Sequence, residues 1–180
     1  MGMDIYGLDP KFETLRPKEP TTDFSYEAED WKEYYEALEK FKQLPGTYYR
    51  SNMWWWRPVV FFLQDYADDI LSPDDIHGMS VNSGYVIDAV KARLLGDRLT
   101  LAIQEGYIKQ WVNTYTENLY ELPDEDCYNC NATGFTNGDP CRICDTKGKV
   151  PNFKKNYPTN EEVFDEFTEF VNNSGGFEVW

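Results

Sequence analysis

Four cysteines carry the clearest chemistry in this sequence. Cys127 and Cys130 form one C-x-x-C pair, Cys141 and Cys144 form a second after ten residues, and the chain has no other cysteine. Zinc prefers four soft donors in a tetrahedron, and a two-residue gap lets both sulfur atoms of a pair reach one ion from a tight turn. The spacing predicts one structural zinc site with these four cysteines as its ligands.

The spacing leaves other uses of the cysteines open. Two disulfides would need an oxidising compartment. A thioredoxin-like redox pair would lie at the start of a helix in a strand–helix unit, which the sequence does not indicate. An iron–sulfur cluster also takes four thiolates. Catalytic zinc is disfavoured because four thiolates leave no open coordination position.

The two cysteine pairs belong to an internal repeat with a period of 14 residues, and each half ends in a glycine, Gly134 or Gly148. The halves resemble the cysteine-rich knuckles of DnaJ-type co-chaperones, which read C-x-x-C-x-G-x-G. Ala132 and Thr146 stand where that pattern has its first glycine. The co-chaperones carry four knuckles and two zinc ions, whereas this chain has two knuckles and no J-domain signature. The resemblance, confined to residues 127–150, implies a zinc hairpin and suggests polypeptide binding.

A second distinctive block contains Trp54, Trp55, Trp56 and Arg57. Three consecutive side chains cannot share one face of a regular element. We therefore expect two rings in the core and the third partly exposed or covering another segment. We also expect Arg57 to stack on an indole. Because Trp and Arg are enriched at interface hot spots, these four residues are candidates for partner binding.

An enzyme is the weakest of the functional hypotheses. The single histidine, His77, follows Asp74 and Asp75 and could act as a base or a ligand. Carboxylates that could bind Mg²⁺ precede it, namely Asp65, Asp68 and Asp69. The phosphate-binding, dinucleotide-binding, metalloprotease and nucleophile-elbow motifs are all missing from the sequence. We expect a protein without catalytic residues.

The surrounding sequence predicts a mainly α fold of about five helices with an inserted zinc-knuckle β-hairpin. Prolines make residues 1–24 look irregular. Apolar residues at helical spacing predict five helices. The first follows a cap at Ser25 and ends before Pro45, the second has Pro58 in its first turn and ends at Leu71, and the third runs from a cap at Ser83 to Glu105. The last two cover residues 108–122 and 160–172. A short strand is expected at the end, over 177–180. Residues 1–126 and 151–180 should form one helical domain, with residues 127–150 as the zinc-knuckle insert.

Composition limits the possible partners and locations. The chain has 180 residues, 32 acidic against 17 basic side chains, and a net charge of −15. Such a charge disfavours wrapping of nucleic acid and permits docking on basic surfaces or imitation of a polyanion. No apolar run is long enough to span a membrane, and the first ten residues do not resemble a secretion signal. We expect a cytoplasmic protein.

The whole chain resembles a family of small, functionally uncharacterised proteins from bacteriophages and prophages. The resemblance rests on the opening Met1–Gly7 (MGMDIYG), the block Asn52–Pro58 (NMWWWRP), the paired knuckles and the closing Ser174–Val179 (SGGFEV). It implies a phage origin, and hence the host cytoplasm, and brings no catalytic residue with it.

Two binding functions follow. The first is a phage accessory protein that binds a host or phage macromolecule, with an acidic surface that inhibits a host defence or nucleic-acid enzyme. The second is nucleic-acid binding by the zinc hairpin, whose cations and rings are Arg142, Lys147, Lys149, Lys154, Lys155, Tyr128 and Phe135. An enzyme using His77 and its neighbouring aspartates is a third. The sequence does not define an oligomeric state.

Overall fold

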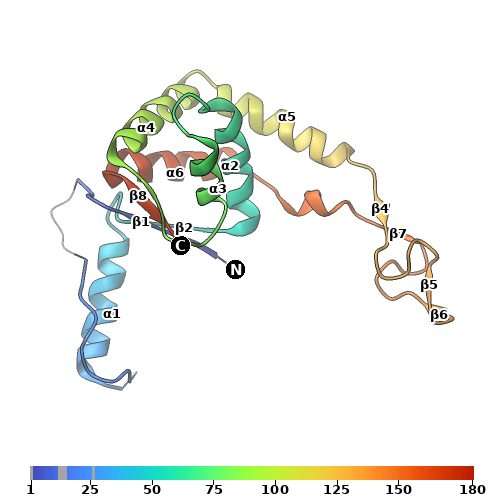
Figure 1. The fold of residues 1–180 in the computed structure, drawn as a ribbon, viewed down its shortest axis with the longest axis horizontal. Helices are drawn as coiled ribbons and strands as arrows, with labels where there is room; N and C mark the ends of the chain where they lie inside the picture. The colour runs from blue at the N-terminus through green and yellow to red at the C-terminus, as the bar shows by residue number, and fades with distance from the viewer. Residues whose placement is uncertain (1, 12–15, 26) are drawn as a thin grey trace.

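The computed structural model describes residues 2–11, 16–25 and 27–180 and confirms a mainly α-helical fold with small antiparallel sheets (Figure 1). The helices of these residues are α1 (Glu29–Lys42), α2 (Met53–Tyr66), α3 (Pro73–Met79), α4 (Ala89–Gln104), α5 (Tyr107–Glu121) and α6 (Glu161–Ser174), with the 3₁₀ helix η1 (Phe153–Asn156). The strands are β1 (Gly2–Gly7), β2 (Tyr48–Asn52), β3 (Tyr85–Ile87), β4 (Glu125–Asp126), β5 (Phe135–Thr136), β6 (Asp139–Pro140), β7 (Lys149–Val150) and β8 (Phe177–Val179). The expected terminal strand is therefore present as β8.

An antiparallel sheet in the order β2-β1-β8-β3 forms one side of the body. The expectation of an irregular segment over residues 1–24 is wrong at its start, because β1 pairs with both β2 and β8. Met3 and Ile5 alternate with the less buried Asp4 and Tyr6, as a sheet with one covered face requires. Within that segment, the expectation for residues 1 and 12–15 lies outside the described residues.

The central sheet joins segments that are far apart in the sequence. β1 contains the opening block, β2 runs into the Trp-rich block at the start of α2, and β8 belongs to the closing block. Three distinctive sequence blocks thus lie side by side in the body. Among the largest fully buried side chains of the main core are Trp56, Phe62, Phe164, Phe167 and Phe177.

Three predicted helix starts are wrong. The first helix begins at Glu29 after Ala28, rather than at a cap on Ser25. The second begins at Met53, so Pro58 lies inside it instead of in its first turn. The long helix expected from Ser83 is interrupted by β3 and begins only at Ala89, because Asp88 caps it by accepting from the N–H groups of the second and third helical residues.

Two arms project from the body (Figure 1). One is α1, whose apolar residues Trp31, Tyr34, Leu38 and Phe41 form a cluster separate from the main core. The chain before α1 covers this cluster, and the Trp31 Nε1–H donates to the Asp23 carbonyl at 3.2 Å. The other arm follows α5, carries the cysteines and returns to the body through η1.

Candidate metal centre

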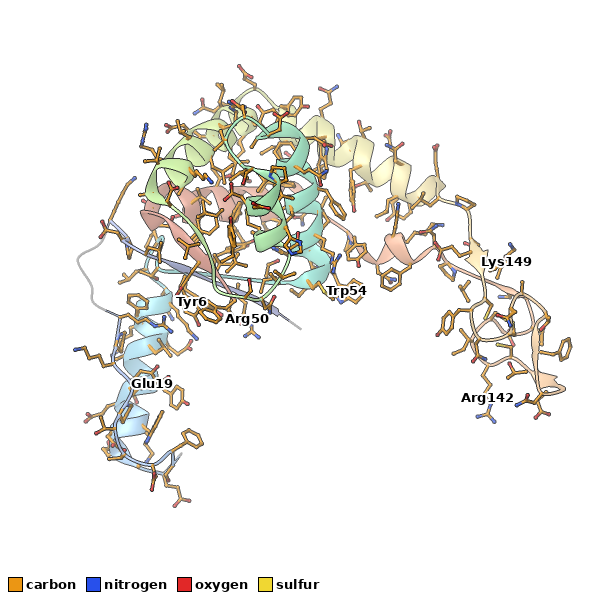
Figure 2. The ribbon with its side chains drawn as sticks, in the orientation of Figure 1. Tyr6, Glu19, Arg50, Trp54, Arg142 and Lys149 are labelled. Atoms are coloured by element: carbon orange, nitrogen blue, oxygen red, sulfur yellow. The ribbon has the colours of Figure 1, made fainter. Side chains whose placement is uncertain are left out.

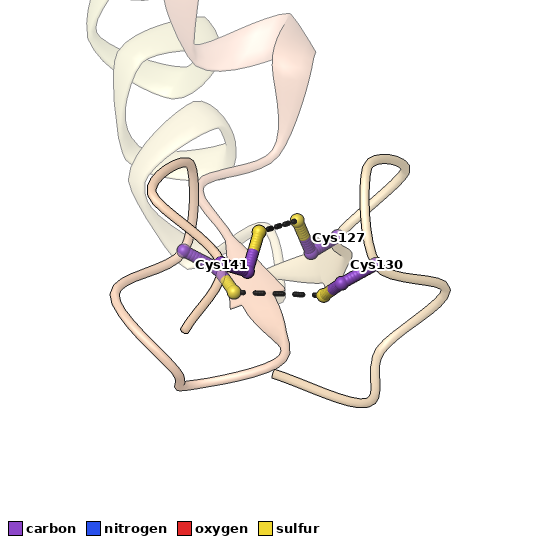
Figure 3. A group of neighbouring side chains, drawn as sticks. Cys127, Cys130 and Cys141 are labelled. Atoms are coloured by element: carbon purple, nitrogen blue, oxygen red, sulfur yellow. Dashed lines mark hydrogen bonds between the residues drawn. The ribbon is translucent and has the colours of Figure 1, made fainter. Parts of the chain in front are cut away.

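The four cysteine sulfur atoms converge on one point in the second arm (Figure 3). All four side chains are buried, and their sulfur atoms lie within 4.8 Å of one another. Cys127 Sγ lies 3.9 Å from Cys141 Sγ, and Cys130 Sγ lies 3.6 Å from Cys144 Sγ. A tetrahedral ion with thiolates at about 2.3 Å requires neighbouring sulfurs about 3.8 Å apart. The donor set therefore fits one tetrahedral metal ion.

The same geometry argues against two alternative uses of the cysteines. All four are free cysteines, and their separations far exceed a disulfide bond. Both C-x-x-C segments lie in turns rather than at the start of a helix, where a thioredoxin-like pair would lie.

The backbone around the cysteines has a local two-fold repeat. The Cys127 N–H donates to the Gly148 carbonyl and the Cys141 N–H donates to the Gly134 carbonyl, both at 2.9 Å. The two strand pairs of the module, β4 with β7 and β6 with β5, are equivalent. A shift of 14 residues relates β4 to β6 and β5 to β7, and the same register is found in both pairs. The module is thus two interlocked knuckles with two short ladders, where one hairpin was expected.

Backbone and side-chain N–H groups surround the sulfur atoms. Gly134 N–H donates to Cys130 Sγ and Gly148 N–H donates to Cys144 Sγ, each at 3.3 Å. The Asn129 amide donates to Cys141 Sγ at 3.3 Å and, together with backbone N–H groups, lowers the pKa of that thiol, whereas burial raises the pKa of Cys144. Donors of this kind favour thiolates, the form that binds metal. The sequence prediction did not include Asn129, although its place inside the first pair could have suggested it.

The knuckles need backbone conformations that usually favour glycine. An added Cβ on Gly134 would lie 2.4 Å from the Thr146 carbonyl oxygen, and one on Gly148 would lie 2.3 Å from that of Ala132. Each knuckle therefore presses its glycine against the other knuckle. Ala132 and Thr146 themselves have positive φ values of 64° and 63°. In each knuckle, the residue at the position of the first glycine of the co-chaperone pattern therefore has a left-handed backbone conformation although it is not glycine.

The cations predicted for nucleic-acid binding do not form an unopposed basic surface. Lys149 contacts Asp126, and Lys155 Nζ lies 3.9 Å from Asp124 Oδ1. Residues 121–155 contain six carboxylates against five basic side chains. The rings of Tyr128 and Phe135 are exposed, but they stand in a nearly neutral region.

The Trp block divides between core and surface, but only one ring lies in the core, where two were expected. Trp56 is 1% exposed and its Nε1–H donates to the Met79 carbonyl at 2.6 Å. Trp55 is half-buried, and Trp54 is 36% exposed while its ring covers η1. The expectation that Arg57 stacks on an indole is wrong, because its guanidinium lies 5.5 Å from the ring centroid of Tyr157.

The residues of the enzyme hypothesis are only partly brought together. Asp75 and Asp69 are ion-paired with cations of α4, at 2.6 Å and 2.7 Å. His77 is exposed on α3 and lines a surface pocket with Asp68 and Ser80. In the described part of the chain, the four cysteines form the one group of three or more such side chains arranged to hold a metal.

The chain matches no protein-family model, no curated protein and no solved structure. None of the described helices is long and apolar enough to cross a membrane. The metal centre is therefore characterised by its own geometry: four buried thiol donors that could hold a single ion.

Proposed function

We propose that this protein is a non-catalytic, zinc-containing binding protein that recognises another protein. The observation that carries the proposal is the closed four-sulfur centre in an arm outside the body. Four thiolates at tetrahedral spacing suit zinc and leave no position for a substrate. A metal ion without an open coordination position cannot bind a substrate. We therefore assign it a structural role, which is to stabilise the folded form of the arm.

The acidic charge supports a partner with a basic surface. With 32 acidic and 17 basic side chains, the molecule would attract such a surface from a distance. A host defence or nucleic-acid enzyme has this character, and the resemblance to phage proteins would place the encounter in the host cytoplasm. Nucleic-acid binding by the second arm has less support, because Lys149 and Lys155 already face carboxylates.

Elemental analysis of purified protein tests the metal assignment. We expect about one zinc per chain, and Cys127→Ser should lose it and melt the knuckles while the body keeps its helices. Structural zinc contributes on the order of 10 kcal/mol to a module of this kind. Tyr128→Ser is the matched control, since it changes the adjacent exposed residue and leaves all four thiols. Protein without zinc would contradict the assignment, and loss of all helix in Cys127→Ser would contradict a separate insert.

A pulldown at physiological salt tests the binding function. We expect wild type to retain a protein partner from bacterial lysate, and Cys127→Ser, which disrupts the arm and leaves the body, to retain less of it. Tyr128→Ser, which keeps the metal centre, shows whether that loss depends on the folded arm. Recovery of no protein at physiological salt would contradict the proposal. A nucleic-acid ligand would instead show binding that falls steeply as salt rises.

A further inference from the structure

One face of α2 points away from the core toward the root of the second arm. Trp54, Arg57 and Phe61 stand at i, i+3 and i+7, which places them on one side of the helix. Trp54 is 36% exposed and Phe61 is 42% exposed, whereas Trp56 and Phe62 of the same helix are buried. This outward face therefore exposes two large rings on either side of a cation.

The returning chain completes an aromatic cluster on this face. The ring centroid of Trp54 lies 5.8 Å from that of Phe153 and 5.3 Å from that of Tyr157. Phe61 lies 6.5 Å from Tyr157. Phe153 is 55% exposed, while Tyr157 is buried beneath the others. We call Trp54, Arg57, Phe61 and Phe153 the arm-root patch; Figure 2 shows Trp54 at the corner where body and arm meet.

Arg57 lies in the patch with its hydrogen-bonding capacity almost unused. Its Nη2 approaches Met53 Sδ at 3.7 Å, and its Nε is buried without a hydrogen-bond partner. Among the described residues no carboxylate lies within 4.0 Å of its guanidinium, although eight other ion pairs form in the same part of the chain. A buried donor without an acceptor is costly, and a guanidinium pairs best with a carboxylate in two parallel hydrogen bonds.

We propose that the arm-root patch binds an acidic, aromatic peptide segment of a protein partner. A carboxylate of that segment pairs with Arg57, and an apolar side chain packs among Trp54, Phe61 and Phe153. Exposed contiguous rings around an arginine have the composition of an interface hot spot. The inference rests on the proposed function as a protein-binding module: the wider surface of the partner is basic, and the segment that enters the patch carries a carboxylate for Arg57.

Charge favours a peptide over a nucleic acid at this patch. Nearby Lys154 has no carboxylate within 4.0 Å among the described residues, but Lys155 is held by Asp124. Glu125 and Asp126 follow immediately at the root of the arm. These carboxylates, on a chain of net charge −15, would repel a run of phosphates. A single peptide carboxylate can instead be matched at short range to Arg57, the one cation of the patch.

Nuclear magnetic resonance of the metal-loaded full chain tests the proposal. The probe is the peptide acetyl-Asn-Phe-Glu-Phe-Asn-amide, which has one carboxylate, compared with acetyl-Asn-Phe-Gln-Phe-Asn-amide, which has none. We expect the acidic peptide to shift the Trp54 indole N–H signal, which is identified by its loss in Trp54→Phe, and the neutral peptide to bind at least tenfold more weakly. Arg57→Gln should reduce binding of the acidic peptide at least tenfold. Phe153→Ser, at an exposed ring, should weaken both peptides.

Arg142→Gln is the matched control, since it removes an exposed cation from the far end of the same arm. It should bind the acidic peptide as wild type does. No shift at millimolar peptide, or equal binding of the two peptides, overturns the proposal. So does displacement of the peptide by an oligo-dT strand, which would assign the patch to nucleic acid. The zinc content of the same samples distinguishes this inference from the proposed function. Zinc-loaded protein that does not bind the peptide would contradict the inference and leave the proposed function unaffected.

Discussion

Ala132 and Thr146 hold the left-handed backbone of the two knuckles without being glycine. Their φ values of 64° and 63° place them in a region that costs an ordinary L-residue about 1–2 kcal/mol. Both residues also supply the carbonyl oxygens against which the opposing glycines pack. The backbone strain therefore lies at the contact between the knuckles. We expect it to lower the stability of the folded module and, with it, the affinity for a metal ion.

Replacing Ala132 or Thr146 with glycine should tighten metal binding. Glycine relieves the strain but loses more freedom on folding, so we expect a net gain of about 1 kcal/mol at each site. That gain corresponds to about fivefold tighter zinc binding in equilibrium competition with a chelator. Gly134→Ala is the reverse control and should release zinc, since its Cβ would lie 2.4 Å from the Thr146 carbonyl oxygen. Weaker zinc retention by the glycine variants would contradict the strain.

Asp75 forms a buried network that joins α3, β3 and α4. Its carboxylate accepts from the Ser72 N–H at 2.7 Å, from Lys91 Nζ at 2.6 Å and from the Tyr85 hydroxyl at 3.1 Å. Burial alone would raise the pKa of Asp75, but the hydrogen bonds from Lys91 and Ser72 outweigh it and lower the pKa. This aspartate, a neighbour of His77 in the enzyme hypothesis, thus has a structural role.

Asp75→Asn should destabilise the protein at neutral pH by about 2 kcal/mol, because it leaves Lys91 without its anion while that ammonium keeps some contact with water. A lowered folded-state pKa means that the stability from Asp75 is fully present above the unfolded pKa of about 3.9 and disappears as the pH falls through the folded value. Urea unfolding followed by helix signal should therefore separate the two proteins at neutral pH and bring them together in strong acid. A difference that stays constant over this range would rule out the charged pair as its source.

At the scale of elements, α2 shows how one helix serves both core and surface. Trp56 is buried against the Tyr49 and Phe167 rings, while Trp54 on the opposite side covers η1. Asn52 caps the helix by accepting from the N–H groups of Trp54 and Trp55. The cap satisfies two N–H groups of the first turn and stabilises the start of the helix, while the packing of Trp56 in the core leaves Trp54 on the outer side.

Alanine substitution should separate the three tryptophans. Trp56→Ala removes a fully buried ring and should cost roughly 3–5 kcal/mol. Trp54→Ala should cost only about 1 kcal/mol, since its ring is partly exposed, and Trp55→Ala should lie between them. Thermal melts of the three variants provide the measurement. Three equally destabilised proteins would mean that Trp54 belongs to the core and is not available to a ligand.

Local signals predicted the elements whose structure depends on neighbours in the sequence. The cysteine spacing indicated four thiols that the structure brings within 4.8 Å of one another, and α6 begins after Asn160, close to where its apolar spacing placed it. β1 and β3 were missed because each becomes a strand through pairing with distant segments. Val86 and Ile87 fit helical spacing with the residues after them, so the pattern alone could not reveal the strand. Of the arm-root patch, the sequence singled out Trp54 and Arg57 but not Phe61 or Phe153, since the patch joins Trp54 to a residue about a hundred positions later.

At the scale of the whole molecule, Tyr157 makes several of the contacts between the second arm and the body, beside the direct contact of Trp54 with Phe153. Tyr157 contacts Trp54, Phe61 and Phe153, and the Tyr115 hydroxyl donates to its carbonyl at 2.9 Å. The contacts come from α2, η1 and α5, so they fix the direction in which the arm leaves the body. Removing this ring should free the arm without affecting its metal.

Small-angle X-ray scattering measures the consequence. Tyr157→Ala should broaden the distance distribution and raise the radius of gyration, because the arm samples many directions, while the zinc content stays the same as in wild type. Tyr128→Ala, at a ring that is 76% exposed on the knuckles, should leave the scattering unchanged. A Tyr157→Ala profile identical to that of wild type would show that other contacts hold the arm.

Because the knuckles form a two-fold repeat, each half of the module contains every type of residue and strand from which the four-sulfur centre is built. A peptide covering Glu125–Thr136 has one C-x-x-C pair and its glycine, and its partner half repeats the same parts. Two identical half-peptides should therefore assemble around one ion as a small homodimer. By the same logic, two whole chains could exchange halves, so that each ion is shared between molecules at high protein concentration.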